Sequence, residues 1–333
     1  MHMSNQLEIS VNKYGGVVLG TANHYKNVLA YHENGGSGSS KTINVCSASG
    51  KTTELLRGIT DLFELHELIP KDSYQKLIKR FLDQFKFNHI KLIGELFQDQ
   101  KPRGRNAKDH FMLHYGNLKM IIDSMDFSDF SINQFNHSTK KAEILGFGEL
   151  ASSAIFSDYF NAFEIRNLLL DSREFIKTAS PGVEDAYMFD YTNAPVDFEE
   201  TKKICIPKFT FSFENYDMIV CQGFVAKDSR TGKDTLLGDD GSDYSGAVLG
   251  VTLRVKDVSY FKDVDAVMTE DPEKNPDARA IYDISYEDYD KLCQKNGGGP
   301  VRRDSVALLG SSSIPTYVRF VDRPFSKKYT TIH

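Results

Sequence analysis

The sequence predicts an α/β fold, because strand, small-residue turn and helix follow one another twice near the N-terminus. Residues 7–11 alternate apolar and polar side chains, as a half-buried strand does, and lead into the glycine pair Gly15 and Gly16. A helix is expected over 21–32. Residues 43–46 form the second expected strand, which runs through a turn of small residues into another helix.

The middle of the chain is expected to be helical, followed by an irregular stretch. Apolar residues spaced by three and four predict an amphipathic helix over 73–97, with a break near Asn88. A further helix is expected over 147–160. Residues 178–204 contain two prolines and predict a loop with short strands.

The second half mixes short strands with helices. Alternation or apolar runs predict strands over 208–213, 218–225 and 258–261, and residues 314–321 are expected to form the last strand. Helices are expected over 244–255 and 286–295, the latter behind a capping-box pattern.

Length and composition exclude several classes of protein. The 333 residues correspond to about two units of ordinary size or one large α/β domain. With 40 basic and 46 acidic residues, the net charge of −6 argues against a nucleic-acid-binding protein. No apolar run is long enough for a membrane span, and the first residues lack the features of a secretory signal. The four cysteines have no metal-binding spacing, so no residue is predicted to ligate a metal, and free thiols predict a reducing, cytoplasmic location.

Glycine-bearing turns after expected strands indicate phosphate binding, since backbone N–H groups at such turns bind anions. Residues 50–52 read Gly-Lys-Thr, but Val45 stands where the P-loop pattern requires glycine. The Rossmann glycine pattern does not occur at these turns either. Phosphate binding is therefore expected without either of these standard motifs.

Six segments, in order, resemble the catalytic domain of aspartate kinase in the amino acid kinase superfamily. They are residues 13–16 (K-F-G-G in that family), 45–56 (V-V-S-A-M-G-K-T-T-x-x-L-L), 144–149 (I-L-S-F-G-E), 235–244 (T-T-L-G-R-G-G-S-D-Y), 262–279 (T-D-V-D-G-I-Y-T-x-D-P-R-x-x-P-x-A-R) and the closing strand at 314–319. The resemblance covers residues 9–332, almost the whole chain.

The resemblance implies a three-layer αβα sandwich with a mostly parallel central sheet. It implies an N-terminal lobe, 1–204, that binds the phosphoryl acceptor, and a C-terminal lobe, 205–333, that binds the nucleotide. The implied reaction transfers a phosphoryl group from ATP, with Mg²⁺, to a carboxylate of aspartate or a related amino acid. The expected partner is this small molecule, with neither nucleic acid nor membrane, and the resemblance allows a homodimer. The family's C-terminal ACT domains, and feedback inhibition through them, are expected to be absent.

The resemblance also implies roles for individual residues. Lys13 and Asp243 are the expected catalytic residues. Ser47, Thr53, Glu149, Asp239 and Ser242 are expected to bind the acceptor, with Glu149 pairing its ammonium group. Nucleotide binding is expected from Gly15, Gly16, Lys262, Asp263, Met268, Asp271 and Pro272.

Departures from the family pattern cluster at these ligand positions. Asp239 replaces the arginine expected to hold a carboxylate of aspartate, and Asp240 replaces the next glycine. An anion in place of a bidentate cation reverses the local field. Other departures are Val17, Val18, Lys262, Met268, Glu273 and Gly299, the last replacing a lysine. Arg302, Arg303 and Lys295 are candidates for a relocated cation.

Two functional hypotheses follow from this pattern, with a third beside them. The first is an active kinase for aspartate or a different amino acid, including an acceptor with a second amino group facing Asp239 and Asp240. The second is a catalytically weak or inactive paralogue that binds nucleotide or amino acid and regulates a partner. The third is phosphorylation of another group, such as a carbamate or a phosphonate, on the same fold.

Overall fold

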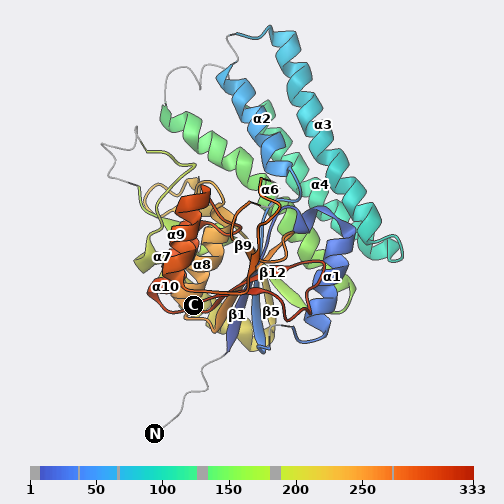
Figure 1. The fold of residues 1–333 in the computed structure, drawn as a ribbon. Coiled ribbons are helices and arrows are strands. Elements are labelled where there is room, and N and C mark those ends of the chain that lie inside the picture. The colour runs from blue at the N-terminus through green and yellow to red at the C-terminus, as the bar shows by residue number, and fades with distance from the viewer. Residues whose placement is uncertain (1–7, 37, 66–67, 126–133, 181–188, 272–273) are drawn as a thin grey trace.

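The main sheet lies at the centre of the molecule (Figure 1). It has eight strands in the order β11-β13-β12-β8-β1-β2-β5-β3. The computed structural model describes residues 8–36, 38–65, 68–125, 134–180, 189–271 and 274–333. The strands from β12 to β3 pair in parallel, whereas β13 is antiparallel to β12. The α/β fold with a mostly parallel sheet is therefore confirmed.

The strands of the main sheet are short, with two to six residues each. Those of the main sheet are β1 (Ile9–Tyr14), β2 (Lys41–Cys46), β3 (Asn167–Leu170), β5 (Met218–Gln222), β8 (Asp257–Lys262), β11 (Asp283–Ile284), β12 (Thr316–Phe320) and β13 (Thr330–Ile332). Two small sheets hold β4 (Lys177–Thr178), β6 (Val225–Asp228) and β7 (Asp234–Leu236), and β9 (Val267–Met268) and β10 (Ala280–Ile281).

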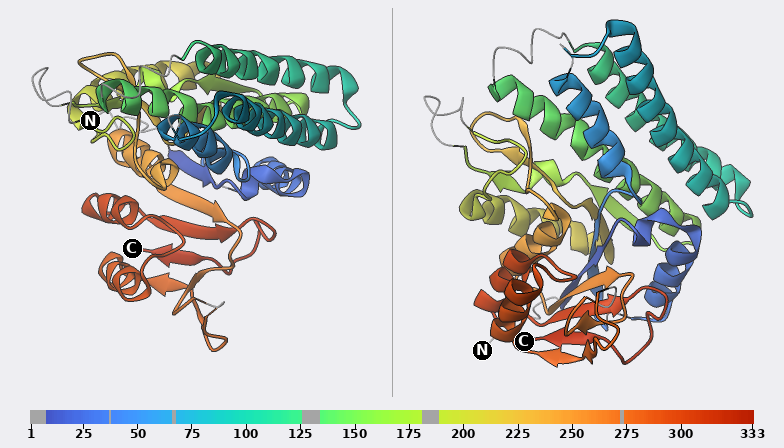
Figure 2. Two further views of the ribbon diagram at one scale, coloured as in Figure 1. Left: turned by 90° about the horizontal axis from the view of Figure 1, so that it is seen from above. Right: turned by 45° about the horizontal axis from the view of Figure 1, so that its top comes forward.

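Helices cover both faces of the sheet (Figure 2). Against one face lie α7 (Phe198–Asn215), α8 (Gly241–Leu253), α9 (Tyr286–Asn296) and α10 (Arg303–Ser311). Against the other lie α1 (Ala22–Glu33), α2 (Thr52–Glu64), α3 (Lys71–Leu96), α4 (Lys101–Asp123) and α6 (Gln134–Ala162). Short 3₁₀ turns at Val18–Gly20 and Ser172–Glu174 complete the described elements.

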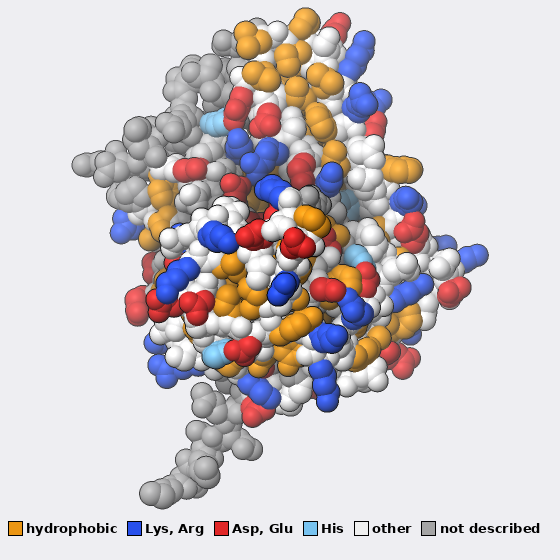
Figure 3. Space-filling view, in the orientation of Figure 1, with side chains coloured by type: hydrophobic (Ala, Val, Ile, Leu, Met, Phe, Trp, Pro, Cys, Tyr) orange, Lys and Arg blue, Asp and Glu red, His pale blue; other side chains and the backbone are white. Residues whose placement is uncertain are grey.

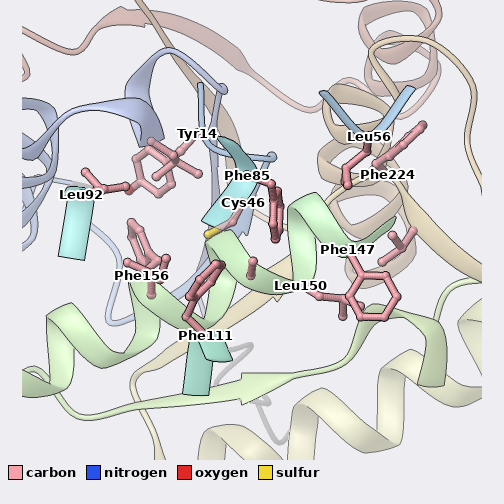
Figure 4. Close-up of a cluster of buried hydrophobic side chains, with 14 of the residues drawn as sticks. Tyr14, Cys46, Leu56, Phe85, Leu92, Phe111, Phe147, Leu150, Phe156 and Phe224 are labelled. Carbon is pink, nitrogen blue, oxygen red and sulfur yellow. The ribbon is translucent and has the colours of Figure 1, made fainter. Parts of the chain in front are cut away.

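The central sheet separates two hydrophobic cores, because successive side chains of each strand point to opposite faces. In β1, Val11 faces the core beneath α7 and α8, whereas Tyr14 faces the core beneath α6. In the core beneath α6, Tyr14 stacks on Phe156, with 5.3 Å between the ring centroids, and Cys46 and Phe85 lie nearby (Figure 4). The expected three-layer αβα arrangement thus follows from strands that are apolar on both faces.

The strand predicted over 208–213 is wrong, because these residues lie in α7. Cys205, Phe209 and Phe213, spaced by four, are buried, while Phe211 between them is 68% exposed. The side chain of Asp197 accepts the N–H of Glu200 and caps the helix start. The alternation of phenylalanines mimics a strand, but burial follows the helical period.

Three further expectations need correction. The break predicted near Asn88 does not occur, since α3 runs unbroken through it. The strand predicted over 218–225 divides into β5 and β6 at Phe224, which has a positive φ of 68°. Residues 314–321 hold β12, but β13 follows as the last strand. Helices α4 and α10 were not predicted, although their residues form continuous helices.

The remaining helix and strand predictions agree with the structure within a few residues, with two exceptions. Helix α6 begins well before the helix expected at 147–160, and residues 198–204 of the expected irregular stretch 178–204 belong to α7. Leu7, Pro181, Pro272 and Glu273 lie outside the described residues. The lobe boundary expected at 204/205 falls inside α7. Among the helices of the described residues, none combines the length and apolarity that a membrane crossing requires.

Candidate functional site

A cavity of about 530 Å³ opens where β1, β2 and β8 reach their carboxyl ends. Ligands of open parallel sheets bind at this edge, beside the turns that connect strands to helices. The cavity brings together ten of the residues expected to bind substrates: Lys13, Gly15, Gly16, Ser47, Thr53, Glu149, Asp239, Ser242, Lys262 and Asp263.

Beneath the cavity, two lysines share one buried carboxylate. The Lys13 Nζ lies 2.6 Å from the Asp243 Oδ1, and the Lys262 Nζ donates to both oxygens at 3.1 and 3.0 Å. The backbone N–H of Arg302 donates to the Asp243 Oδ2 at 3.1 Å. Asp243 is 1% exposed, so the cluster is shielded from water.

The electrostatics of this cluster favour an anion. Burial alone would raise the pKa of Asp243, but the charges and hydrogen bonds of Lys13 and Lys262 lower it to about 2. Burial lowers the pKa of Lys13, against the opposing effect of Asp243. Two ammonium groups facing one carboxylate leave one positive charge uncompensated at the floor of the cavity, and a bound phosphate would neutralise it.

The N-terminus of α8 meets the same floor. Gly241 and Ser242, at its start, line the cavity, and no side chain of Asp240 caps the helix. The helix dipole at this end adds to the attraction for an anion. Gly223 is required nearby, because a Cβ there would lie 2.5 Å from the Ser242 Cβ.

Two turns interlock at the cavity wall. The Gly50 N–H donates to the Gly16 carbonyl at 2.7 Å, which joins the turn after β1 to the turn after β2. A Cβ at Gly16 would lie 2.9 Å from the carbonyl oxygens of both Ala48 and Gly50. Glycine at position 16 is therefore a packing requirement.

Glu149, on α6, presents a buried carboxyl to the cavity. Its Oε1 accepts the Ala48 N–H at 3.1 Å, while its buried Oε2 has no hydrogen-bond partner within the described residues. Burial raises the pKa of Glu149 to about 8. An ammonium group of a ligand would satisfy the Oε2 and favour the ionised carboxylate.

On the side of the cavity away from the buried lysines, the charged side chains are exposed to solvent and form only a long ion pair. Asp239 is 93% exposed, and its Oδ1 lies 3.4 Å from the Nη2 of Arg57, which is itself 47% exposed. Asp240 precedes α8 with a φ of 52°. We refer to Arg57, Asp239 and Asp240 as the mouth, and to Lys13, Lys262 and Asp243 as the floor.

None of the three candidates for a relocated cation lines this cavity. Arg302 donates to the carbonyls of Leu237 and Asp239 at 2.6 and 2.9 Å, so it supports the loop that bears Asp239. Arg303 pairs with Asp290, and Lys295 pairs with Glu270. The arginine that does line the cavity is Arg57.

Part of the expected nucleotide set lies elsewhere. Met268 is in β9, paired with Ala280 of β10, and Asp271 follows that strand. Neither lines the cavity that holds Lys262 and Asp263. Pro272 lies outside the described residues.

Sequence reasoning missed Arg57, although one signal pointed to it. Thr53 was expected in the site, and Arg57 lies four residues further along the same helix. Residues four apart share a helix face, so a site residue at 53 draws attention to 57.

The profile of the amino acid kinase family matches residues 8–319. The chain belongs to this family. Its curated relatives include the bifunctional aspartokinase/homoserine dehydrogenase 2 of Arabidopsis thaliana, 25% identical over 84% of this chain and 27% of the relative. The aspartokinase of Helicobacter pylori is 31% identical over 56% of this chain and 43% of the relative. The chain thus spans less than half the length of these relatives.

Solved structures of other amino acid kinases share the fold. The R-state structure of E. coli aspartokinase III, in complex with aspartate and ADP, has a TM-score of 0.76 and 19% identity over 98% of this chain and 64% of that one. Clostridium acetobutylicum aspartate kinase has a TM-score of 0.65 and 18% identity, covering 98% of this chain and 62% of that one. These likenesses confirm that this amino acid kinase has the aspartokinase fold.

Proposed function

We propose that this amino acid kinase transfers the γ-phosphoryl group of ATP to a carboxylate of aspartate or a related amino acid. The observation that carries the proposal is the positively charged floor, Lys13 and Lys262 on the buried Asp243, in one cavity with the unpartnered oxygen of Glu149. The first group of residues suits a phosphate and the second suits an ammonium group. The aspartokinase relatives support the same reaction class.

In the proposed reaction, a carboxylate oxygen of the acceptor attacks the γ-phosphorus, and the bond from that phosphorus to the β–γ bridging oxygen breaks. The products are an acyl phosphate and ADP. The attacking carboxyl is already ionised near neutral pH, so no general base is required. The protein's contribution is to position the reactants and to stabilise negative charge, which Lys13 and Lys262 do from the floor.

Glu149 orients the acceptor in this proposal. Its free Oε2 receives the ammonium group, which directs the acceptor's reactive carboxylate toward Lys13. Ser47, Thr53 and Ser242 line the space between and offer hydroxyl groups. The acceptor would be held mainly by residues of 1–204, and the nucleotide mainly by residues of 205–333.

Magnesium would enter with the nucleotide. The Asp243 oxygens already accept from two lysines and one backbone N–H, so they do not fit a metal ion. Within the described ranges, no group of three or more His, Cys, Asp or Glu side chains could hold one. Mg²⁺ commonly binds phosphate oxygens with one or two carboxylates, and bound this way it would neutralise phosphate charge.

The four cysteines are buried and unpaired. Free thiols are typical of reducing compartments, so we place the proposed reaction in the cytoplasm.

The test is acceptor-dependent ADP release by the purified chain with ATP and Mg²⁺, across aspartate and a panel of amino acids. Hydroxylamine in the assay converts an acyl phosphate to a hydroxamate, which identifies the product class. The matched control is Lys13→Met, which removes the floor's central cation. We expect hydroxamate from the unmodified chain and almost none from the variant. If no acceptor raises ADP release above background, the proposal fails.

A second candidate is a non-catalytic, ligand-binding paralogue. It is favoured by Asp239 and Asp240, which place two carboxylates where the family pattern has an arginine and a glycine. Measurable ATP binding without turnover, together with a change in the activity of an aspartokinase upon mixing, would support this candidate. Robust turnover by the isolated chain would exclude it.

A further inference from the structure

Among the described residues, the Lys and Arg side chains that line the cavity are Lys13, Lys262 and Arg57. The two lysines both form ion pairs with the buried Asp243. Arg57 has only a loose partner, since its Nη2 lies 3.4 Å from an oxygen of the 93% exposed Asp239. An exposed pair of this kind contributes little and exchanges readily with other anions. Arg57 is thus the cavity cation most available to a ligand.

The position of Arg57 relative to Glu149 is fixed by packing between α2 and α6. Gly148 lies against α2, because a Cβ there would be 3.3 Å from the Thr52 Cγ2 and 3.7 Å from the Leu56 Cδ1. Arg57 immediately follows Leu56, and Glu149 immediately follows Gly148. Both side chains line the same cavity. An amino acid whose ammonium group meets Glu149 therefore has a guanidinium group available for a carboxylate.

We infer that Arg57 is the specificity-determining residue for the acceptor, and that it binds the carboxylate that is not phosphorylated. This inference rests on the proposed function. The acceptor is then an amino dicarboxylic acid: one carboxylate meets the floor, the second meets Arg57, and the ammonium group meets Glu149. A planar guanidinium group suits this role because it can donate two parallel hydrogen bonds to a carboxylate.

Asp239 has a defined part in this arrangement. It is the anion that pairs with Arg57 when the acceptor is absent. The acceptor carboxylate must displace it, so Asp239 weakens binding by competition. Substitutions of Arg57 and of Asp239 should therefore change acceptor binding in opposite directions.

The experiment compares aspartate with its α-amide, isoasparagine, which keeps the ammonium group and the β-carboxylate but lacks the α-carboxylate. We expect Arg57→Ala to raise the KM for aspartate about 10- to 100-fold, the range for a lost charged hydrogen-bond pair, with little change for isoasparagine. Arg57→Lys should fall between, because lysine lacks the planar fork. Asp239→Asn should lower the KM for aspartate. Thermal unfolding of each variant checks that the fold is intact.

A rescue sharpens the test. Asp239→Arg added to Arg57→Ala places a guanidinium group on the other side of the mouth, and it should restore discrimination between aspartate and isoasparagine. Equal losses for both acceptors, or an unchanged ratio in Arg57→Ala, would overturn the inference while leaving the kinase activity in place.

Failure of the proposed function is distinguishable. If the unmodified chain turns over no acceptor, calorimetric binding of aspartate and isoasparagine replaces the kinetic assay. A preference for aspartate that Arg57→Ala abolishes supports the role of Arg57 in a protein that binds without catalysis. The absence of that preference overturns it.

Discussion

The floor and the mouth of the cavity hold ion pairs of opposite character. At the floor, Asp243 is 1% exposed and accepts from two lysines at 2.6 to 3.1 Å. At the mouth, Arg57 and Asp239 are 47% and 93% exposed and meet at 3.4 Å. The first cluster is preorganised by burial, whereas the second is held only weakly by solvent-screened attraction.

In our proposal, the buried floor serves the phosphoryl transfer and the exposed mouth selects the acceptor. A buried cluster cannot lose one member without leaving an uncompensated charge, so the floor is constrained by stability as well as by function. The mouth can change residue type at little structural cost. The replacement of the family's arginine by Asp239 at the mouth is of this kind, while Lys13 and Asp243 keep the family pattern at the floor.

The largest effect is expected from Lys13→Met. Loss of a preorganised charge beside the transferring phosphoryl group should lower kcat about 10³-fold, with little change in the KM for the acceptor. Arg57→Ala should instead raise the KM for the acceptor and leave kcat nearly unchanged. Steady-state kinetics with both ATP and the acceptor varied measure kcat and KM for each variant. A kcat loss in Arg57→Ala equal to that in Lys13→Met would erase the distinction between the two regions.

Asp243→Asn should have the largest effect on stability. It leaves Lys13 and Lys262 beside each other without a buried counter-ion, which should cost about 3–5 kcal/mol in the free energy of unfolding. Urea unfolding measures this loss. Adding Lys13→Met to Asp243→Asn removes one of the two ammonium groups and should restore part of the stability. A midpoint equal to that of the unmodified chain would show that the floor is less shielded than its burial indicates.

The floor also shows how far sequence reasoning reaches. The two βα units were predictable, because their strands, glycine turns and helices are encoded locally. The placement of Lys13 and Asp243 in one site came from matched segments about 230 residues apart, not from local pattern. The bond from Lys262 to Asp243 was not foreseen, since the family pattern has threonine at position 262 and only the fold brings this lysine to the floor.

Where local pattern and tertiary packing disagree, the prediction was wrong. On α7, Phe209 and Phe213 are buried while Phe211 is exposed to solvent, and the alternating sequence alone does not reveal this. Arg57 was missed for a related reason. Its relevance depends on which face of α2 meets the cavity, and that orientation is set by the contact of Gly148 with α2.

Glu149 should make acceptor binding depend on pH. Its pKa is raised from the ordinary value of 4.5 to about 8 by burial, so below pH 8 the empty site holds the neutral acid. An ammonium group requires the carboxylate, and binding must therefore release a proton. Between about pH 6 and 8 the acceptor KM should fall up to tenfold per pH unit, and level off above pH 8.

Calorimetry in buffers of different ionisation enthalpy measures that proton directly. The matched control is Glu149→Gln, which should bind the acceptor weakly and without the pH dependence. The same shift affects stability: the unfolded chain ionises Glu149 above pH 4.5 and the folded chain only near 8, so stability falls as pH rises between these values. Acceptor binding without proton release at pH 6.5 would contradict the assignment of Glu149 to the ammonium group.

The smallest expected effect is the coupling between Arg57 and Asp239 in the absence of ligand. Thermal unfolding of Arg57→Ala, Asp239→Ala and the double variant should give midpoints that add within about 2 °C, because exposed ion pairs contribute little to stability. Saturating aspartate should change this result. The unmodified chain and Asp239→Ala should then be stabilised, while both variants that lack Arg57 should respond weakly. Strong coupling without ligand would instead make the Arg57–Asp239 pair a structural element of the mouth, and Arg57 would no longer be free to bind the acceptor.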